Sequence, residues 1–147
     1  MIDQQIMKPY FAYGSNMWND QMNRRCPQNK KIGIARLPGY RWIISNRGYA
    51  NVVKSEEHTV EGVLFEISDT DEAALDGYEG VASGSYAKAE IQVLSGDKSL
   101  PALVYVDPVT TEGTPPAEYV QRINAALADA GLTAEYVDGQ VRKFIPE

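Results

Sequence analysis

Apolar residues along this chain fall into short segments, and most of these segments show the alternation or the unbroken apolar run of a β-strand. The segments are rich in β-branched and aromatic residues, which favour strands. Gly, Pro, Asn and Asp separate several of them, as at Pro38-Gly39, Asn46–Gly48 and Ser95–Asp97. The polar residues Ser55–His58 are expected to form a loop. The predicted strands cover residues 9–13, 30–37, 40–45, 49–53, 59–67, 86–94 and 100–106.

Helical spacing of apolar residues marks a smaller number of segments. The longest predicted helix begins at Thr114-Pro115-Pro116, where proline is tolerated in the first turn, and ends at Gly131. Its apolar stripe consists of Val120, Ile123, Leu127 and Ala130. Shorter helices are expected over Trp18–Cys26, over Ser68–Asp76 with Gly77 as the stop, and over Thr133–Val137.

Together these elements predict a mixed α/β (α+β) fold. Six or seven short strands with a few helices favour a curled sheet, that is, a small mixed β-barrel with flanking helices. A length of 147 residues is most simply one domain, 1–147, and is long enough to bury a core.

The junction at Pro9–Asn16 is the most informative stretch of the chain. A buried strand runs into a tight turn at Gly14-Ser15-Asn16, and a helix-compatible segment follows. Gly14 allows another group to approach the backbone closely, and Ser15 and Asn16 are residue types that cap helices. Free N–H groups at such a turn suit an anion or a developing negative charge. The same pattern also fits a strand that simply ends in a capped helix.

Composition narrows the class of protein. The chain is 44% apolar and 23% charged, as in ordinary globular proteins, and has no apolar run long enough for a membrane span. No signal-peptide pattern begins the chain, and the single cysteine, Cys26, excludes an intrachain disulfide. Both features indicate a cytoplasmic protein. Around the only histidine, His58, no spacing of metal ligands occurs, so no metal is expected.

Charge argues for a small-molecule partner. The net charge of −6 disfavours nucleic acid or a membrane surface as the main partner. Residues 1–58 carry nine Lys/Arg and four Asp/Glu, a net charge of +5, whereas residues 59–147 carry five and sixteen, a net charge of −11. The basic part could attract an anionic substrate, but we favour interleaving of the two parts in one fold, so that their charges offset each other.

Several catalytic classes are excluded by their motifs. Ala12–Asn16 lacks the flanking glycines of a serine-hydrolase elbow, nothing supports a triad that uses His58, and no P-loop or dinucleotide glycine pattern occurs. The catalytic class that remains is proton transfer by a carboxylate, with backbone N–H groups that stabilise negative charge. Glu79 lies in a flexible segment of small residues, but physical reasoning alone does not select it over the fifteen other acidic residues of 59–147.

A resemblance to a known family resolves this choice. The sequence resembles the gamma-glutamylcyclotransferase family along nearly the whole chain, with the matching segments in the same order and at plausible spacing. The segments that carry the resemblance are Phe11–Met17, Arg25-Cys26-Pro27, Gly39-Tyr40, Leu75–Val81, Gly84-Ser85-Tyr86, Val104-Tyr105-Val106, Tyr119, Gly131-Leu132 and Tyr136.

The resemblance implies an enzyme on a small mixed barrel that cyclises a gamma-glutamyl group to 5-oxoproline and releases an amino acid or amine. Such chemistry is typical of glutathione metabolism and needs no cofactor or metal. The protein is expected to be a monomer or a homodimer. By position, Glu79 matches the catalytic acid/base. Residues that match substrate-binding positions are the loop Tyr13, Gly14, Ser15 and Asn16 and the pocket tyrosines Tyr86 and Tyr119.

This chemistry agrees with the residue types present. The substrate's own α-amine is the nucleophile, so no nucleophilic side chain is required. Burial beside Tyr86 and Val81 is expected to raise the pKa of Glu79 towards the working pH. The identity of the leaving group stays open, and a non-enzymatic domain that binds a small molecule or a partner is the alternative on the same fold.

Overall fold

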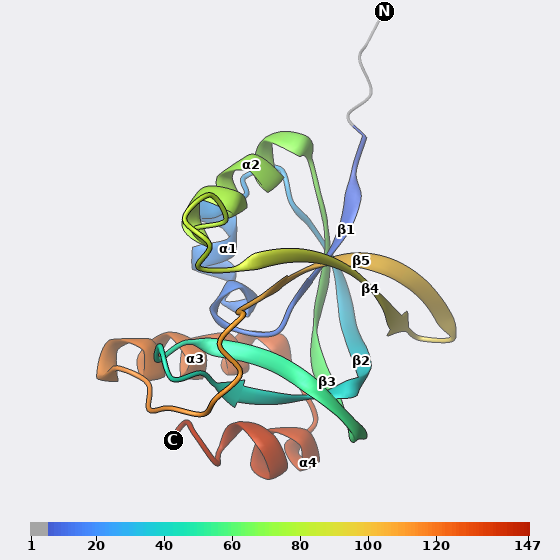
Figure 1. Cartoon of the computed structure of the whole chain (residues 1–147). Coiled ribbons are helices and arrows are strands. Elements are labelled where there is room, and N and C mark those ends of the chain that lie inside the picture. The colour runs from blue at the N-terminus through green and yellow to red at the C-terminus, as the bar shows by residue number, and fades with distance from the viewer. Residues whose placement is uncertain (1–5) are drawn as a thin grey trace, which may run out of the picture.

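In the computed structural model, which describes residues 6–147, five strands close into a barrel (Figure 1). The strands are β1 (Lys8–Ala12), β2 (Lys30–Ile44), β3 (Ala50–Ile67), β4 (Ala87–Ser95) and β5 (Lys98–Val106). They follow one another in the order β1-β3-β2-β4-β5, with antiparallel pairing between these neighbours. A parallel pairing of Tyr10 with Leu103 joins β1 to β5 and closes the barrel. The predicted mixed barrel is confirmed.

The predicted count of six or seven strands is wrong, because two pairs of predicted strands are each one long strand. Residues 30–37 and 40–44 lie in β2, and residues 50–53 and 59–67 lie in β3, so that the predicted strand ends Ser45 and Tyr49 fall just outside the two strands. β2 and β3 pair with each other over nearly their whole length. This pairing keeps β2 continuous across two register shifts, between Lys31 and Gly33 and between Pro38 and Tyr40.

Gly39 shows how the predicted turn becomes part of a strand. Pro38 pairs with Thr59 and Tyr40 pairs with Lys54, so Gly39 faces the polar segment 55–58 of β3 across a break in register. Gly39 takes a φ of +83°, which residues with a side chain rarely adopt. The turn expected at Pro38-Gly39 and the loop expected at Ser55–His58 are therefore the two sides of one bulge in the β2–β3 pair.

Helical segments cover one side of the strands (Figure 1). A 3₁₀ turn η1 packs against α3, α1 contacts α2, and a π-helical turn η2 contacts β2. Their bounds are η1 Ser15–Met17, α1 Asn19–Arg25, α2 Asp69–Tyr78, α3 Ala117–Ala130, α4 Ala134–Tyr136 and η2 Val137–Val141. In the described chain, no helix is both long enough and apolar enough to cross a bilayer.

The start of α2 is as predicted, but its end is not. The Ser68 hydroxyl accepts from the Asp71 N–H at 3.1 Å, and the Asp71 carboxylate accepts from the Ser68 N–H at 3.3 Å, which makes a capping box. Gly77 does not stop the helix, which continues to Tyr78. The left-handed residue that turns the chain is Gly80, with a φ of +64°. Glu79 is therefore the last residue before the turn.

Two hydrophobic clusters fix β1 between them. Phe11 belongs to one cluster with Trp42 and Ile123, and Tyr10 belongs to the other with Phe65. Neighbouring side chains of a strand point to opposite faces, so β1 is anchored on both. The loop that follows β1 is consequently held in a defined place.

The basic and acidic parts of the chain interleave, as we favoured from the sequence. Ion pairs join residues before and after position 58, with N–O distances of 3.5 Å or less. These pairs are Lys8 with Asp69 and Glu72, Arg41 with Glu112, and Arg47 with Asp107.

Candidate active site

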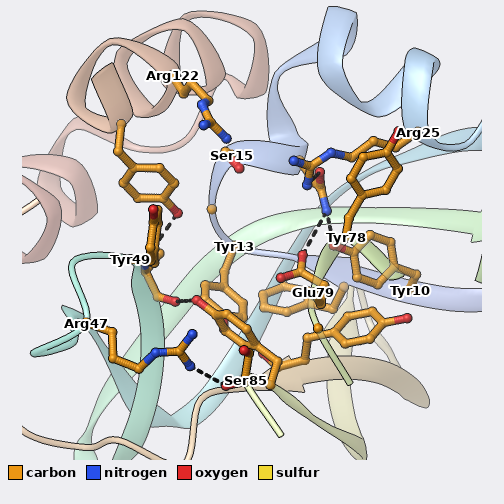
Figure 2. A pocket seen from close by; sticks show the side chains of 18 residues that line it. Tyr10, Tyr13, Ser15, Arg25, Arg47, Tyr49, Tyr78, Glu79, Ser85 and Arg122 are labelled. Atoms are coloured by element: carbon orange, nitrogen blue, oxygen red, sulfur yellow. Dashed lines mark hydrogen bonds between the residues drawn. The ribbon is translucent and has the colours of Figure 1, made fainter. Parts of the chain in front are cut away.

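A cavity of about 310 Å³ lies where β1 passes into η1 and α2 ends (Figure 2). All seven residues predicted for the site line it, although they come from four separate parts of the chain. They are Tyr13, Gly14, Ser15, Asn16, Glu79, Tyr86 and Tyr119. The fold therefore brings together all the positions that were predicted to bind substrate or to act in catalysis.

Other lining residues were not predicted from the sequence. They include Tyr10, Arg25, Arg47, Tyr49, Tyr78 and Arg122. Tyr10, Arg25 and Tyr78 lie within or beside the motif segments, which is a signal that could have found them. Arg47 and Arg122 carry no such signal, because a turn and a helix surface commonly hold exposed arginines.

Tyr13 is anchored at both its side chain and its backbone. Its hydroxyl donates to the Tyr105 carbonyl at 2.6 Å, and its own carbonyl accepts from the Trp42 indole N–H at 2.9 Å. Burial raises the pKa of Tyr13 well above its ordinary value, so the phenol stays protonated. These contacts hold the start of the loop rigidly against the barrel.

The loop residues after Tyr13 leave backbone N–H groups free. Among residues 6–147, no acceptor binds the N–H of Gly14, Ser15 or Asn16. The expectation that a Ser15 or Asn16 side chain caps the following helix is wrong: Gly14 is the N-cap residue of η1, and no side chain caps it. The Ser15 hydroxyl instead accepts from the Gln21 side chain at 2.8 Å.

Gly14 permits the close approach that its residue type suggested. A Cβ atom there would lie 3.2 Å from the Ala50 Cβ and 3.4 Å from the Tyr119 hydroxyl. The contact with Ala50 is tighter than an ordinary van der Waals distance, and the one with Tyr119 is at the lower end of the ordinary range. A larger residue would therefore push the loop away from the wall of the cavity.

Asn16 links the loop to Glu79 through its buried side chain. Its Nδ2 donates to the Tyr10 hydroxyl at 2.9 Å and lies 3.5 Å from the Glu79 Oε1. Its Oδ1 accepts from Gln21 at 2.9 Å and from the Arg25 guanidinium at 3.2 Å. A guanidinium only donates, so the amide must present its NH₂ group to Glu79. In Figure 2 the dashed line that ends at the Glu79 carboxylate marks this contact.

Glu79 is half-buried at the end of α2 and faces the cavity. Burial raises the pKa of its carboxyl above the ordinary value, and the nearby positive charge of Arg25 partly opposes this. The predicted direction of the shift is thus confirmed. Tyr86 lines the same cavity as Glu79, and Val81 packs with Tyr86 against the cluster that contains Tyr10 and Phe65. A carboxyl with a raised pKa is suited to accept and return a proton.

Tyr86 and Tyr119 both bind the backbone of Ala50 at the opposite wall. The Tyr86 hydroxyl donates to the Ala50 carbonyl at 2.7 Å, and the Tyr119 hydroxyl accepts from the Ala50 N–H at 3.2 Å. Tyr49 packs edge-on against Tyr119, with ring centroids 5.0 Å apart. Both hydroxyls are thus held in fixed positions at the cavity.

A buried polar network supports this wall. The Asp107 carboxylate accepts from the Ser45 hydroxyl at 3.0 Å, and the Asp107 backbone N–H donates to the Asn51 side-chain oxygen at 2.9 Å. Arg47 lies 3.5 Å from the same carboxylate and donates to the Ser85 carbonyl at 2.6 Å. The network ties the β2–β3 turn to the segment that carries Tyr86.

Two residues considered from the sequence take no part in the site. Cys26 is fully buried, and burial raises the pKa of its thiol to about 12, so it is not a nucleophile at neutral pH. His58 is exposed on β3, with its Nδ1 2.6 Å from the Ser55 hydroxyl. No cluster of three His, Cys, Asp or Glu side chains suited to a metal ion occurs within residues 6–147.

Comparisons with known proteins agree with the geometry. Residues 10–122 match the family model described as gamma-glutamyl cyclotransferase, AIG2-like. The human protein named gamma-glutamylcyclotransferase is 28% identical over 138 residues, which cover 86% of this chain and 73% of that protein. The bovine protein of the same name is 29% identical over 139 residues, with the same coverage. A solved structure described as gamma-glutamyl cyclotransferase superposes with a TM-score of 0.83 at 26% identity, over 91% of this chain and 86% of that one.

Proposed function

Since this chain belongs to the gamma-glutamyl cyclotransferase, AIG2-like family, we propose that it cyclises a gamma-glutamyl group to 5-oxoproline and releases an amino acid or amine. One observation supports this above the others: Glu79, a carboxyl with a raised pKa, shares one cavity with a loop whose N–H groups are free. This combination provides a proton acceptor and a place for negative charge in one cavity.

The reaction is an intramolecular acyl transfer. The α-amine of the γ-glutamyl group attacks its own γ-carbonyl, which forms the ring C–N bond. The Glu79 carboxylate takes the proton that the amine loses. The protonated carboxyl then delivers this proton to the leaving nitrogen as the original amide C–N bond breaks. Glu79 ends the cycle ionised, and no side chain forms a covalent intermediate.

The raised pKa of Glu79 serves both halves of this cycle. A carboxylate of ordinary pKa is a weak base near neutral pH, and burial strengthens it. The same shift keeps the protonated form accessible when the leaving nitrogen needs a proton. Asn16, which is held by Gln21 and Arg25, presents an N–H group 3.5 Å from the carboxylate.

The loop and the two tyrosines act by holding the substrate. The free N–H groups of Gly14, Ser15 and Asn16 bind the substrate α-carboxylate or the oxyanion that develops on the γ-carbonyl. Tyr86 and Tyr119 bind its other polar groups. Cyclisation joins two atoms of one molecule, so a bound pose close to the ring supplies much of the acceleration.

The experiment is turnover of a panel of γ-glutamyl dipeptides and γ-glutamylamines, with 5-oxoproline detected by mass spectrometry. Glu79→Gln should retain the fold and lose about 10²- to 10⁴-fold in kcat, the range for removal of a general acid or base. Glu90→Gln is the matched control, because Glu90 is exposed on β4 and does not line the cavity.

Two results would overturn the proposal. Wild-type turnover in Glu79→Gln would remove Glu79 from the chemistry. If no member of the panel gave 5-oxoproline while γ-glutamyl compounds still bound, the domain would be a small-molecule binder on the same fold.

A further inference from the structure

A second and larger groove, of about 680 Å³, lies beside the cavity and has no part in the chemistry described so far. Arg25, Tyr78 and Arg122 line both hollows, so the two share a wall. Figure 2 shows Arg25 and Arg122 on the same side of the cavity as Ser15. Arg24 and Trp18 line only the groove.

The groove carries positive charge that the protein does not neutralise. Of its three arginines, only Arg122 has a carboxylate partner within residues 6–147: it binds Glu118 through two nitrogens, at 2.6 and 2.9 Å. The described chain places no carboxylate within 4.0 Å of Arg24 or Arg25. Two guanidinium groups are therefore available to a ligand.

Neutral contacts hold both of these guanidiniums in place. Arg25 donates to the Asn16 Oδ1 and lies 4.4 Å from the centre of the Tyr78 ring. Arg24 donates from its Nε to the Asp20 carbonyl and lies 5.6 Å from the centre of the Trp18 ring. Cation–π contacts orient a guanidinium and leave its charge unneutralised. Their remaining N–H groups suit a carboxylate, which arginine binds with two parallel hydrogen bonds.

The reaction itself explains why a groove is needed there. The γ-glutamyl part must lie in the cavity with its reacting atoms near Glu79, so the group attached to the γ-amide has to extend out of the cavity. Arg25 is near enough to Glu79 to affect its pKa and also lines the groove. A leaving group that passes Arg25 would enter the groove beside Arg24.

We propose that this groove binds the leaving group and selects one with two carboxylates, as in γ-glutamyl-glutamate. Arg25 binds the α-carboxylate of the leaving residue, and Arg24 binds its side-chain carboxylate. Arg24 is then a specificity-determining residue outside the catalytic cavity. This inference rests on the proposed cyclisation, and its test is chosen so that the two can fail separately.

The test compares kcat/KM for γ-glutamyl-glutamate and γ-glutamyl-glutamine, which have nearly the same shape and differ by one charge. The wild type should favour the glutamate compound by about fivefold, the effect of one partly exposed ion pair, and mainly through KM. Arg24→Gln should bring the ratio close to one, whereas Arg24→Lys should retain most of the preference. Arg36→Gln removes the same charge from an exposed position on β2 that lines neither hollow, and should leave the ratio unchanged.

Each outcome decides the question. A wild-type ratio near one, or a preference that survives in Arg24→Gln, would overturn the groove assignment while the cyclisation stands. If neither compound yielded 5-oxoproline, and no other γ-glutamyl compound did, the proposed function would fall and the groove assignment with it. A true charge preference should also shrink as salt is added, because exposed ion pairs are screened.

Discussion

Tyr86 and Tyr119 bind the two backbone polar groups of one residue, Ala50, with opposite hydrogen-bond roles: Tyr86 donates to its carbonyl and Tyr119 accepts from its N–H. A phenol has one donor proton and can also accept. Tyr86 has therefore used its proton and can only accept from a ligand, whereas Tyr119 still has a proton to donate. Burial raises the pKa of both hydroxyls, that of Tyr119 to about 12, so both stay protonated at neutral pH.

These unlike roles predict that neither tyrosine can be replaced by phenylalanine without loss. If both bind substrate as proposed, Tyr119→Phe removes a donor to a substrate oxygen, and Tyr86→Phe removes an acceptor for a substrate N–H group. Each should lower kcat/KM by about tenfold and the free energy of unfolding by about 1 kcal/mol, because one polar group of Ala50 also loses its partner. Steady-state kinetics and urea unfolding measure the two effects.

Tyr136→Phe is the control for this pair. Tyr136 is also buried and does not line the cavity, and its hydroxyl lies near the Glu61 backbone without a hydrogen bond of standard geometry in the described structure. Its replacement should change neither kcat/KM nor stability appreciably. If Tyr86→Phe and Tyr119→Phe lost stability but kept wild-type kcat/KM, their hydroxyls would serve packing alone.

The charge of Arg25 should set the pH at which activity appears. In the proposed mechanism Glu79 must be ionised to act as the base, so kcat/KM should fall as the pH drops through the pKa of Glu79 in the free enzyme. Burial raises this pKa above the ordinary 4.5, and Arg25 opposes the rise. Arg25→Gln should therefore move the acidic limb of the kcat/KM profile to higher pH, whereas Arg25→Lys, which keeps the charge, should move it less. An acidic limb at the same pH in all three proteins would contradict the assignment of that limb to Glu79.

Much of the fold follows from local sequence, whereas the site does not. The start of a helix at Ser68 and the end of the longest helix at Gly131 were predicted from local residue types, and the structure has both, with a capping box at Ser68 and a left-handed Gly131. The continuity of β2 through Gly39 depends on pairing with distant residues of β3, which no local pattern reveals.

The site residues were located by their motifs and not by physical reasoning from composition. Nothing local distinguishes Glu79 from other acidic residues, because its raised pKa depends on burial by the folded chain. The contacts of Asn16 with Tyr10, Gln21 and Arg25 cannot be predicted from local sequence either, since they join residues of β1, η1 and α1 that only the fold brings together.

Glu79 should also reduce the stability of the folded protein at neutral pH. Its pKa is raised in the folded state, so the unfolded chain releases the proton at a lower pH than the native protein does. Stability is therefore lost as the pH rises from the unfolded pKa through the folded one. Glu79→Gln should unfold with a larger free energy than the wild type at pH 7, and the difference should disappear near pH 4. Denaturant unfolding at both pH values measures the difference in free energy of unfolding between the variant and the wild type. If that difference were the same at pH 4 and pH 7, ionisation of Glu79 would not be its cause.

Gly62 and Gly77 provide a matched test of how the loop after β1 is held. A Cβ on Gly62 would lie 2.3 Å from the Ala12 carbonyl oxygen and 2.8 Å from the Phe11 ring, so β1 and β3 would have to separate. Gly62→Ala should cost about 1–3 kcal/mol of stability, the range for overpacking, and should lower kcat/KM because Ala12 directly precedes the loop 13–16.

Gly77→Ala makes the same chemical change where the chain has room for it. No atom lies within 4 Å of a Cβ at Gly77, and the residue is helical within α2. Alanine loses less backbone entropy there, so the variant should gain about 0.5–1 kcal/mol while kcat/KM stays at the wild-type value. Chemical denaturation of both variants, with kinetics on the same samples, tests the pair. Wild-type stability and activity in Gly62→Ala would mean that the contact between β1 and β3 does not fix the loop 13–16. The position of this loop would then depend on Tyr13 and its hydrogen bonds to Trp42 and Tyr105.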